Sequence, residues 1–332
     1  MIYINGKFLS KPMSGVIRFA QEVVKQFDKE EYKDKFIVLT DKGVKGNFKF
    51  LKTQEIGMFH GNLFEQISLR NFMKKHKDDE LLNLCNSSPL GIHSISVVHD
   101  VTFLKKPRIY SLPFTLWYKY LIHKKVHQDK LVLTVSETSK KEIIEHYKID
   151  PNKVKVISNG ANILDCQEDD VFLHKYNLFD KNYFLYVGAS YPHKNINSII
   201  ELANKNKDKT FVIVSKDIDY SSKDNLIVID EKISNEALKS LYKHAYALML
   251  LSKFEGFGIP PLEALLNGTK TIILSDIEVF HEIYGDKANY IINNEIDLNN
   301  LKMADEEYIN ELVNKYNWSR VSSNILDILK VK

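Results

Sequence analysis

The sequence predicts an α/β protein of two domains, each built around a parallel β-sheet with helices packed on it. A length of 332 residues suits two domains better than one. Apolar, β-rich runs alternate with helical patterns from end to end, which is typical of parallel strands joined by right-handed crossovers. A polar stretch after residue 163, DCQEDD, has no clear period and is the best candidate for the linker.

The expected strands fall into two groups, one before and one after this linker. Between them lie amphipathic patterns, clearest over residues 16–27, where apolar residues recur every three or four positions as on one helix face. We expect strands at 2–4, 36–39, 95–98, 131–135 and 154–157, and then at 183–187, 211–214, 226–229, 247–251 and 271–274.

Composition excludes several classes of protein. The formal net charge is +3, with 46 basic and 43 acidic residues, which argues against a nucleic-acid-binding protein. Cys85 and Cys166 form no C-x-x-C pair, so neither a disulfide framework nor a zinc site is expected. The first residues, MIYINGKF, lack the pattern of a signal peptide, and no apolar run is long enough to span a bilayer. We therefore expect a cytoplasmic protein.

The segment 101–130 combines basic and aromatic residues. One interpretation is a helix with a solvated basic face and an aromatic side that faces the core. The other is a surface that meets anionic lipid or a lipid-linked acceptor. The basic residues are Lys105, Lys106, Arg108, Lys119, Lys124, Lys125 and Lys130, against one acid, Asp129, and the aromatic residues are Phe103, Tyr110, Phe114, Trp117, Tyr118 and Tyr120.

The most informative stretch is FEGFGIPPLEALLNG, residues 254–268, which follows the apolar run AYALMLLS. Gly256 and Gly258 let the backbone approach a ligand closely. Pro260 or Pro261 suits the first turn of a helix, which Gly268 would end. The order of strand, glycine loop and helix N-terminus predicts an anion site. Its backbone donors are expected at Gly258, Ile259, Leu262 and Glu263, because the prolines have no N–H.

Two carboxylates bracket this loop. Glu255 is expected at the end of the strand, and Glu263 lies about one turn into the helix, where a carboxylate can accept hydrogen bonds from two vicinal hydroxyls. The alternative is a capped helix with a solvated glutamate. The convergence of two glycines, two prolines and two carboxylates favours a binding site.

These residues resemble glycosyltransferase family 4, whose Glu-x7-Glu motif is matched almost residue for residue by 255–264. Four further stretches are similar to family motifs: SGVIRFAQEVV (14–24), SVVHDVTFLKKP (96–107), YVGASYPHKN (186–195) and SDIEVFHEIYGDKANY (275–290). The closest likeness is to the bacterial enzymes that build O-antigens and capsules. The resemblance implies the GT-B fold, in which two Rossmann-like domains face each other across a central cleft.

The resemblance also implies roles for individual residues. Lys194 would pair with the diphosphate of a nucleotide sugar, and His99 would contact the transferred sugar or the reaction centre. Glu255 would stabilise positive charge on the anomeric carbon, and Glu263 would bind the ribose. Ala189 and His193 stand where many relatives carry arginine, so Arg18 is a further candidate for charge at the diphosphate. The remaining expected donor-binding residues are Gly15, Gly188, Gly256, Phe257, Gly258, Ile259 and Leu262.

The resemblance assigns residues 1–163 to the acceptor, residues 164–315 to the nucleotide-sugar donor, and residues 316–332 to a helix that crosses back to the first domain. It implies hexosyl transfer with retention to a saccharide or lipid-linked saccharide, and neither a metal nor a cofactor is expected. An anionic membrane surface is a further candidate partner. The pair Asp217 and Asp219 is therefore interpreted as a surface loop. A non-catalytic sugar-nucleotide-binding scaffold and a GT-B epimerase stay open as alternatives. No G-x-G-x-x-G follows the first strand, which argues against a dehydrogenase.

Overall fold

The computed structural model describes residues 1–105, 111–179, 182–216, 218, 220–223, 225–292 and 295–331. Its chain divides into two compact units. The first contains residues 1–105, 111–160 and 317–331, and the second contains the described part of 161–316. The first crossing between units thus falls three residues before the expected boundary and the second falls one residue after it.

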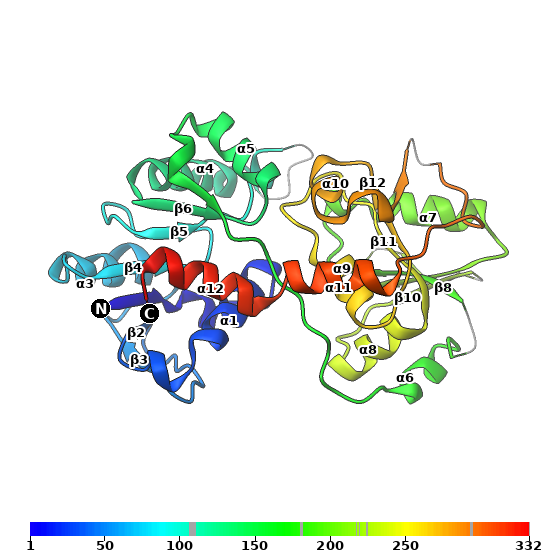
Figure 1. The fold of residues 1–332 in the computed structure, drawn as a ribbon, viewed down its shortest axis with the longest axis horizontal. Helices are drawn as coiled ribbons and strands as arrows, with labels where there is room; N and C mark the ends of the chain where they lie inside the picture. Colours follow the sequence, from blue (N-terminus) through cyan, green and yellow to red (C-terminus); the bar gives the residue numbers. More distant parts are fainter. Residues whose placement is uncertain are drawn as a thin grey trace. The chain divides into compact units, whose positions relative to one another are not determined.

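The first unit is built on a seven-stranded parallel sheet of order β3-β2-β1-β4-β5-β6-β7 (Figure 1). Helix α1 shows why the chain folds this way: the side chain of Ser14 caps it by accepting from the amide of Ile17, and its apolar stripe is buried. The strands are β1 (Ile2–Asn5), β2 (Phe36–Thr40), β3 (Lys52–Glu55), β4 (Glu80–Asn83), β5 (Ile95–Val97), β6 (Leu131–Thr134) and β7 (Val154–Val156), and the main helices are α1 (Gly15–Phe27), α3 (Arg70–Lys75), α4 (Leu112–Gln128), α5 (Glu137–Tyr147) and α12 (Trp318–Leu329).

The second unit has a six-stranded parallel sheet of order β10-β9-β8-β11-β12-β13. Its central strands read YFLYV, TFVIV and AYALML, continuous apolar runs that suit burial on both faces. The strands are β8 (Tyr183–Val187), β9 (Thr210–Val214), β10 (Leu226–Ile229), β11 (Ala245–Leu250), β12 (Ile272–Ser275) and β13 (Asn289–Ile291), and the helices are α6 (Asp170–Lys175), α7 (Ile196–Lys205), α8 (Asn235–His244), α9 (Ile259–Leu266), α10 (Glu278–Tyr284) and α11 (Glu306–Lys315).

Both sheets have the doubly wound strand order. From the first strand of each sheet, the second and third strands lie side by side toward one edge, and the fourth and later strands lie toward the other edge. In the second unit β8 pairs with β11, so the loops that follow these two strands begin side by side at the carboxyl edge of the sheet. This switch point is where open α/β sheets bind ligands. It brings together the loop that carries Lys194 and the loop that carries Glu255.

Three observed strands were missed by the sequence prediction. Strand β3 is polar and mostly exposed at the edge of its sheet, so it has no apolar alternation to detect. Strand β4 follows the charged run KHKDDE and contains two leucines between polar ends, and β13 has only three residues. The expectation of two Rossmann-like α/β units is confirmed. Within the described residues, no helix combines the length and apolar character needed to cross a membrane.

Candidate active site

The loop after β8 carries Lys194. The short 3₁₀ helix Pro192–Lys194 follows the strand, and α7 then begins after Asn195, which has a left-handed backbone at φ 56°. Gly188 is constrained by packing, because a Cβ there would lie 2.9 Å from the hydroxyl oxygen of Tyr186. That hydroxyl donates to the carbonyl of Ala189 at 2.8 Å, which fixes the start of the loop.

The loop after β11 carries Glu255, whose side chain is held by two donors. Its Oε1 atom accepts from Nζ of Lys194 at 2.6 Å and from Oγ of the fully buried Ser252 at 2.7 Å. The Lys194 and Glu255 side chains are 21% and 12% exposed. The sequence assigned these two residues to different parts of a ligand, and their pairing with each other was missed because no local pattern encodes it.

The two loops are also joined through their backbones and rings. The amide of Lys253 donates to the carbonyl of His193 at 2.8 Å. The ring of His193 stacks on Phe254, with 5.2 Å between centroids and 10° between planes. His193 therefore has a packing role: it fixes the distance between the loops and thus between Lys194 and Glu255.

Gly258 caps α9 in a conformation that other residues rarely adopt. Its φ is +84°, and a Cβ would lie 2.5 Å from Cε1 of Phe280. The helix begins at Ile259, so the helical ladder leaves the amides of Gly258 and Ile259 without intrahelical acceptors. The amides of Leu262 and Glu263 lie four residues beyond the carbonyls of Gly258 and Ile259, which is the spacing of the helical ladder, so their expected role as donors to an anion stays a prediction.

The other residues expected around the loop lie inside the unit. Phe257 is 2% exposed and packs edge-on against Tyr316, with 5.2 Å between ring centroids, while Gly256 and Leu262 are buried. Glu263 is 5% exposed, one turn into α9. The alternative of a solvated helix glutamate is therefore wrong, and Glu263 is a buried carboxylate near the N-terminal end of the helix.

His99 lies in the first unit, just beyond β5, and is a buried neutral imidazole. Its Nε2 atom is 3.1 Å from the carbonyl oxygen of Leu84, so Nε2 carries the hydrogen and Nδ1 is an acceptor. The ring packs perpendicular to that of Phe19, with 4.8 Å between the ring centroids. Burial lowers the pKa of His99 to about 4, and the nearby charge of Lys125 acts in the same direction.

Gly15 and Arg18 lie in the first turn of α1, in the same unit. A Cβ on Gly15 would meet no atom within 4 Å, so packing does not require glycine there. This contrasts with Gly258 and leaves open backbone at the N-terminus of α1. Arg18 is half-buried.

A buried polar network at the switch point of the first unit was missed by the sequence analysis. Nζ of Lys7, just beyond β1, donates to Oε2 of Glu65 at 2.9 Å and to Oγ of Ser87 at 3.0 Å. The side-chain amide of Asn5 donates to Glu65 at 2.9 Å and to Asn83 at 3.0 Å. The signal was the polar sequence NGK directly after an apolar strand, where buried charges must be paired.

The segment 101–130 differs from the sequence interpretations in the burial of one lysine and of its aromatic side chains. Lys125 was counted among the basic surface residues but is fully buried, with Nζ 3.3 Å from the carbonyl of Val97, and burial lowers its pKa to about 8. The aromatic side chains divide: Phe103 is buried in the core, whereas Trp117 and Tyr120 are 44% and 48% exposed. Lys106, Arg108 and Tyr110 lie outside the described residues.

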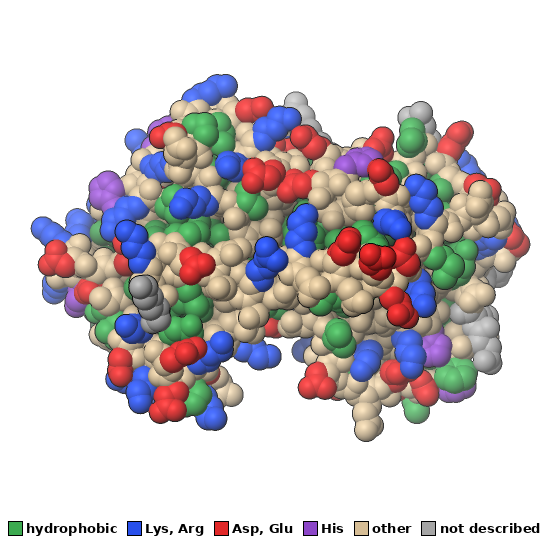
Figure 2. Space-filling model, in the orientation of Figure 1, with side chains coloured by type: hydrophobic (Ala, Val, Ile, Leu, Met, Phe, Trp, Pro, Cys, Tyr) green, Lys and Arg blue, Asp and Glu red, His purple; other side chains and the backbone are tan. Residues whose placement is uncertain are grey.

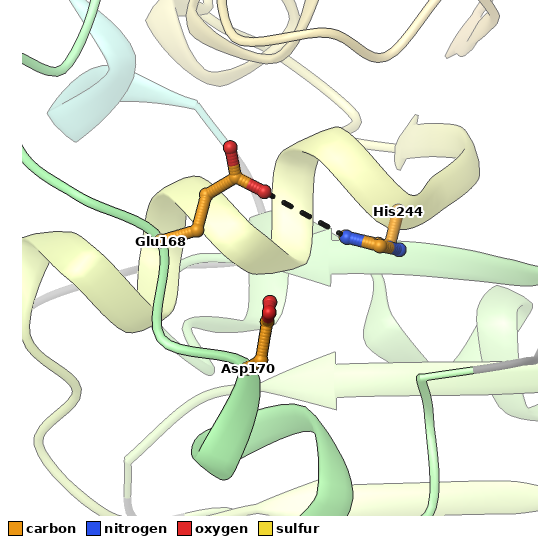
Figure 3. Close-up of side chains that lie close together, drawn as sticks. All are labelled: Glu168, Asp170 and His244. Atoms are coloured by element: carbon orange, nitrogen blue, oxygen red, sulfur yellow. Dashed lines mark ion pairs between the residues drawn. The ribbon is translucent and has the colours of Figure 1, made fainter.

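Glu168, Asp170 and His244 are the one group in the described part of the chain whose ligand atoms lie close enough together for a metal ion, within 4.8 Å (Figure 3). Glu168 is already paired with Nζ of Lys243 at 2.7 Å and lies 3.9 Å from His244. The ammonium competes with a cation and both carboxylates are exposed, so we assign no metal site here. Asp217 and Asp219 lie outside the described residues.

Comparison with known proteins defines the class to which this fold and site belong. Residues 171–316 match the model of glycosyl transferases group 1, and residues 78–163 match that of Glycosyltransferase Family 4. HepE from Anabaena, crystallised with UDP and glucose, superposes with a TM-score of 0.70 at 13% identity, over 100% of this chain and 99% of that one. The architecture is thus GT-B, and the chain belongs to the glycosyltransferases that these two models describe.

Two relatives narrow the comparison. The chain is 35% identical over 238 residues to the O-antigen chain mannosyltransferase RfbU of Salmonella typhimurium. This match covers 68% of this chain and 64% of that protein. It is 24% identical over 228 residues to the O-antigen chain mannosyltransferase B of Escherichia coli, covering 61% and 58%. The matched region thus spans less than two thirds of either relative.

Proposed function

We propose that this protein is a retaining hexosyltransferase that moves a hexose from a nucleotide-diphosphate sugar to a saccharide acceptor during synthesis of O-antigen, capsule or a similar polysaccharide. The observation that carries the proposal is the Lys194–Glu255 pair at the switch point of the second unit, beside the open amides of α9. A cation, two amides and a carboxylate are the groups needed to hold a diphosphate next to a sugar.

The donor is assigned to the second unit on chemical grounds. The ammonium of Lys194 is a compact charge suited to phosphate, and the amides of Gly258 and Ile259 lie at the positive end of a helix. Glu263, buried one turn further, would accept from the ribose hydroxyls. These groups supply positive potential without a metal, so we propose that the reaction is metal-independent. The UDP and glucose bound to HepE and the names of the two relatives support a nucleotide-sugar donor.

The proposed reaction breaks the bond between the anomeric carbon and the phosphate oxygen, whose electron pair leaves with the nucleoside diphosphate. The acceptor hydroxyl forms its bond to the same face of the sugar, and its proton passes to a phosphate oxygen. Glu255 would stabilise the positive charge that develops on the anomeric carbon. His99, neutral and with Nδ1 as an acceptor, would bind a hydroxyl of the sugar or acceptor.

A second part of the proposal is that the enzyme works at an anionic membrane surface and uses a lipid-linked acceptor. Helix α4 supports it with apolar side chains that are 41–59% exposed: Leu112, Phe114, Leu116, Trp117 and Tyr120. Lys119 and Lys124 are exposed on the same helix. Aromatic rings and basic side chains together are typical of surfaces at the headgroup level.

A screen of nucleoside diphosphates and sugar nucleotides tests the donor assignment. A nucleotide that binds the folded state raises its melting temperature, and the matching sugar nucleotide should then be hydrolysed slowly without acceptor. Lys194→Met should remove both signals, whereas the matched control Lys205→Met, an exposed lysine of α7, should keep them. Binding without sugar release would favour the scaffold, and a changed sugar nucleotide would favour the epimerase.

A further inference from the structure

The first unit has a pocket of about 490 Å³ between α4 and α5. It is lined by Leu116, Lys119, Tyr120, His123, His146 and Tyr147. We propose that this pocket binds the phosphate of an anionic phospholipid headgroup and so fixes the first unit to a membrane surface. This inference rests on the proposed membrane association and adds a specific binding site to it.

Charge complementarity is the first argument. Lys119, His123 and His146 can each carry positive charge, and none of the six lining residues is a carboxylate. Burial lowers the pKa of both histidines, and in each case neighbouring cations, Lys119 among them, lower it further. At neutral pH the histidines are therefore mainly uncharged and Lys119 supplies the positive charge, while a bound anion would raise the pKa of both histidines and let them gain charge.

A buried donor is the second argument. Tyr147 is 4% exposed and its hydroxyl has no hydrogen-bond partner among the described residues. Burial raises the pKa of this hydroxyl, so it stays a donor at every physiological pH. Buried tyrosine hydroxyls normally find a partner, and an oxygen of a phosphate bound in the pocket would be an acceptor for this one.

The surroundings of the pocket favour a lipid over free phosphate. Leu116 and Tyr120 line it and are 59% and 48% exposed, and Leu112 lies one turn before Leu116 on the same face of α4. Basic, histidine and apolar side chains lie next to one another over α4 and α5, at the upper left of Figure 2. A free anion needs no apolar rim, whereas the headgroup of a bilayer lipid is continuous with apolar chains.

The test compares two double variants that replace the same two residue types, one lysine and one histidine, on the same helix. The pocket variant, Lys119→Gln with His123→Gln, replaces two residues that line the pocket. The control variant, Lys124→Gln with His127→Gln, replaces the next lysine and histidine of α4, which do not line it. Partition onto vesicles of phosphatidylglycerol and of phosphatidylcholine is measured by co-sedimentation. Melting temperature and donor hydrolysis, measured without vesicles, report folding and the state of the second unit.

We expect binding to the anionic vesicles alone, weakened about fivefold by the control pair, as for one exposed charge, and at least 25-fold by the pocket pair. Inorganic phosphate should compete weakly. Equal losses from the two pairs would overturn the pocket and leave only general attraction. No binding by the unmodified protein would overturn both the pocket and the membrane proposal. Neither result would affect the hexosyltransferase proposal, which donor hydrolysis tests separately.

Discussion

Replacing Glu255 by glutamine should separate donor binding from catalysis, because Glu255 and a diphosphate compete for the same ammonium. In the ligand-free chain, Nζ of Lys194 lies 2.6 Å from Oε1 of Glu255. Glutamine keeps the size of the side chain and can still accept from Ser252, but it lacks the charge. Lys194 is then released to a donor phosphate, while the anomeric carbon loses its carboxylate.

The size of the effect follows from the geometry of the pair. At 2.6 Å, two unit charges attract by about 1.6 kcal/mol at the dielectric constant of water and by about 6 kcal/mol at an effective value of 20. Both side chains are partly exposed, so the lower figure applies, which is about tenfold in affinity. Loss of one group that stabilises developing charge typically lowers kcat by about 100-fold or more.

We therefore expect Glu255→Gln to bind nucleoside diphosphate up to about tenfold more tightly and to turn over about 100-fold more slowly. Calorimetry with the nucleotide that most raises the melting temperature measures the first quantity, and donor hydrolysis measures the second. The control is Glu201→Gln, an exposed carboxylate of α7. An increase in the dissociation constant that matched the loss of kcat would refute the competition and make Glu255 a residue that binds the donor ground state.

Four further predictions concern the same two units. Lys194→Ala should weaken nucleotide binding by about 1.5–3 kcal/mol without unfolding the protein, and unchanged binding in a folded variant would contradict the diphosphate assignment. Glu263→Gln should mainly raise the donor KM, and a fall in kcat alone would remove Glu263 from the ribose. Activity should survive EDTA; complete loss, restored by magnesium or manganese, would bring Asp217 and Asp219 back as candidates. His99 has a pKa of about 4 in the folded chain and 6.5 in the unfolded chain, so between these values the folded chain binds fewer protons. The free energy of unfolding should therefore fall as the pH drops through this window. Urea titrations at several pH values should show a weaker dependence in His99→Gln.

The strand, turn and helix around Gly258 could be predicted from the sequence because their determinants are local. Gly258, the two prolines and both glutamates act within one strand, one turn and one helix, and their spacing alone places them. The pairing of Lys194 with Glu255 could not be predicted, because it joins loops 61 residues apart through the order of strands in the sheet.

The misjudged residues share a physical cause, which is that tertiary packing decides which side of an element is buried. Lys125 has the sequence context of its exposed neighbour Lys124, yet it points to the carboxyl ends of β4 and β5. The amides of α9 that lack an intrahelical acceptor depend in the same way on the residue at which the helix begins. One residue of difference in a helix start changes which amides lack an acceptor.

The last helix has a consequence for how the protein is made. Trp318, Val321 and Ile325 of α12 belong to the same hydrophobic core as β1 and α1, and Trp318 is 1% exposed. A Cβ on Gly160 would lie 2.6 Å from the amide of Trp318, so the end of the first stretch and the start of α12 are packed together. On the ribosome, the first unit emerges before the second but lacks this part of its core until α12 has left the exit tunnel. The described part of residues 161–316 can therefore mature while the first unit still waits for its closing helix, and a stop codon before residue 317 would damage the half that was synthesised first.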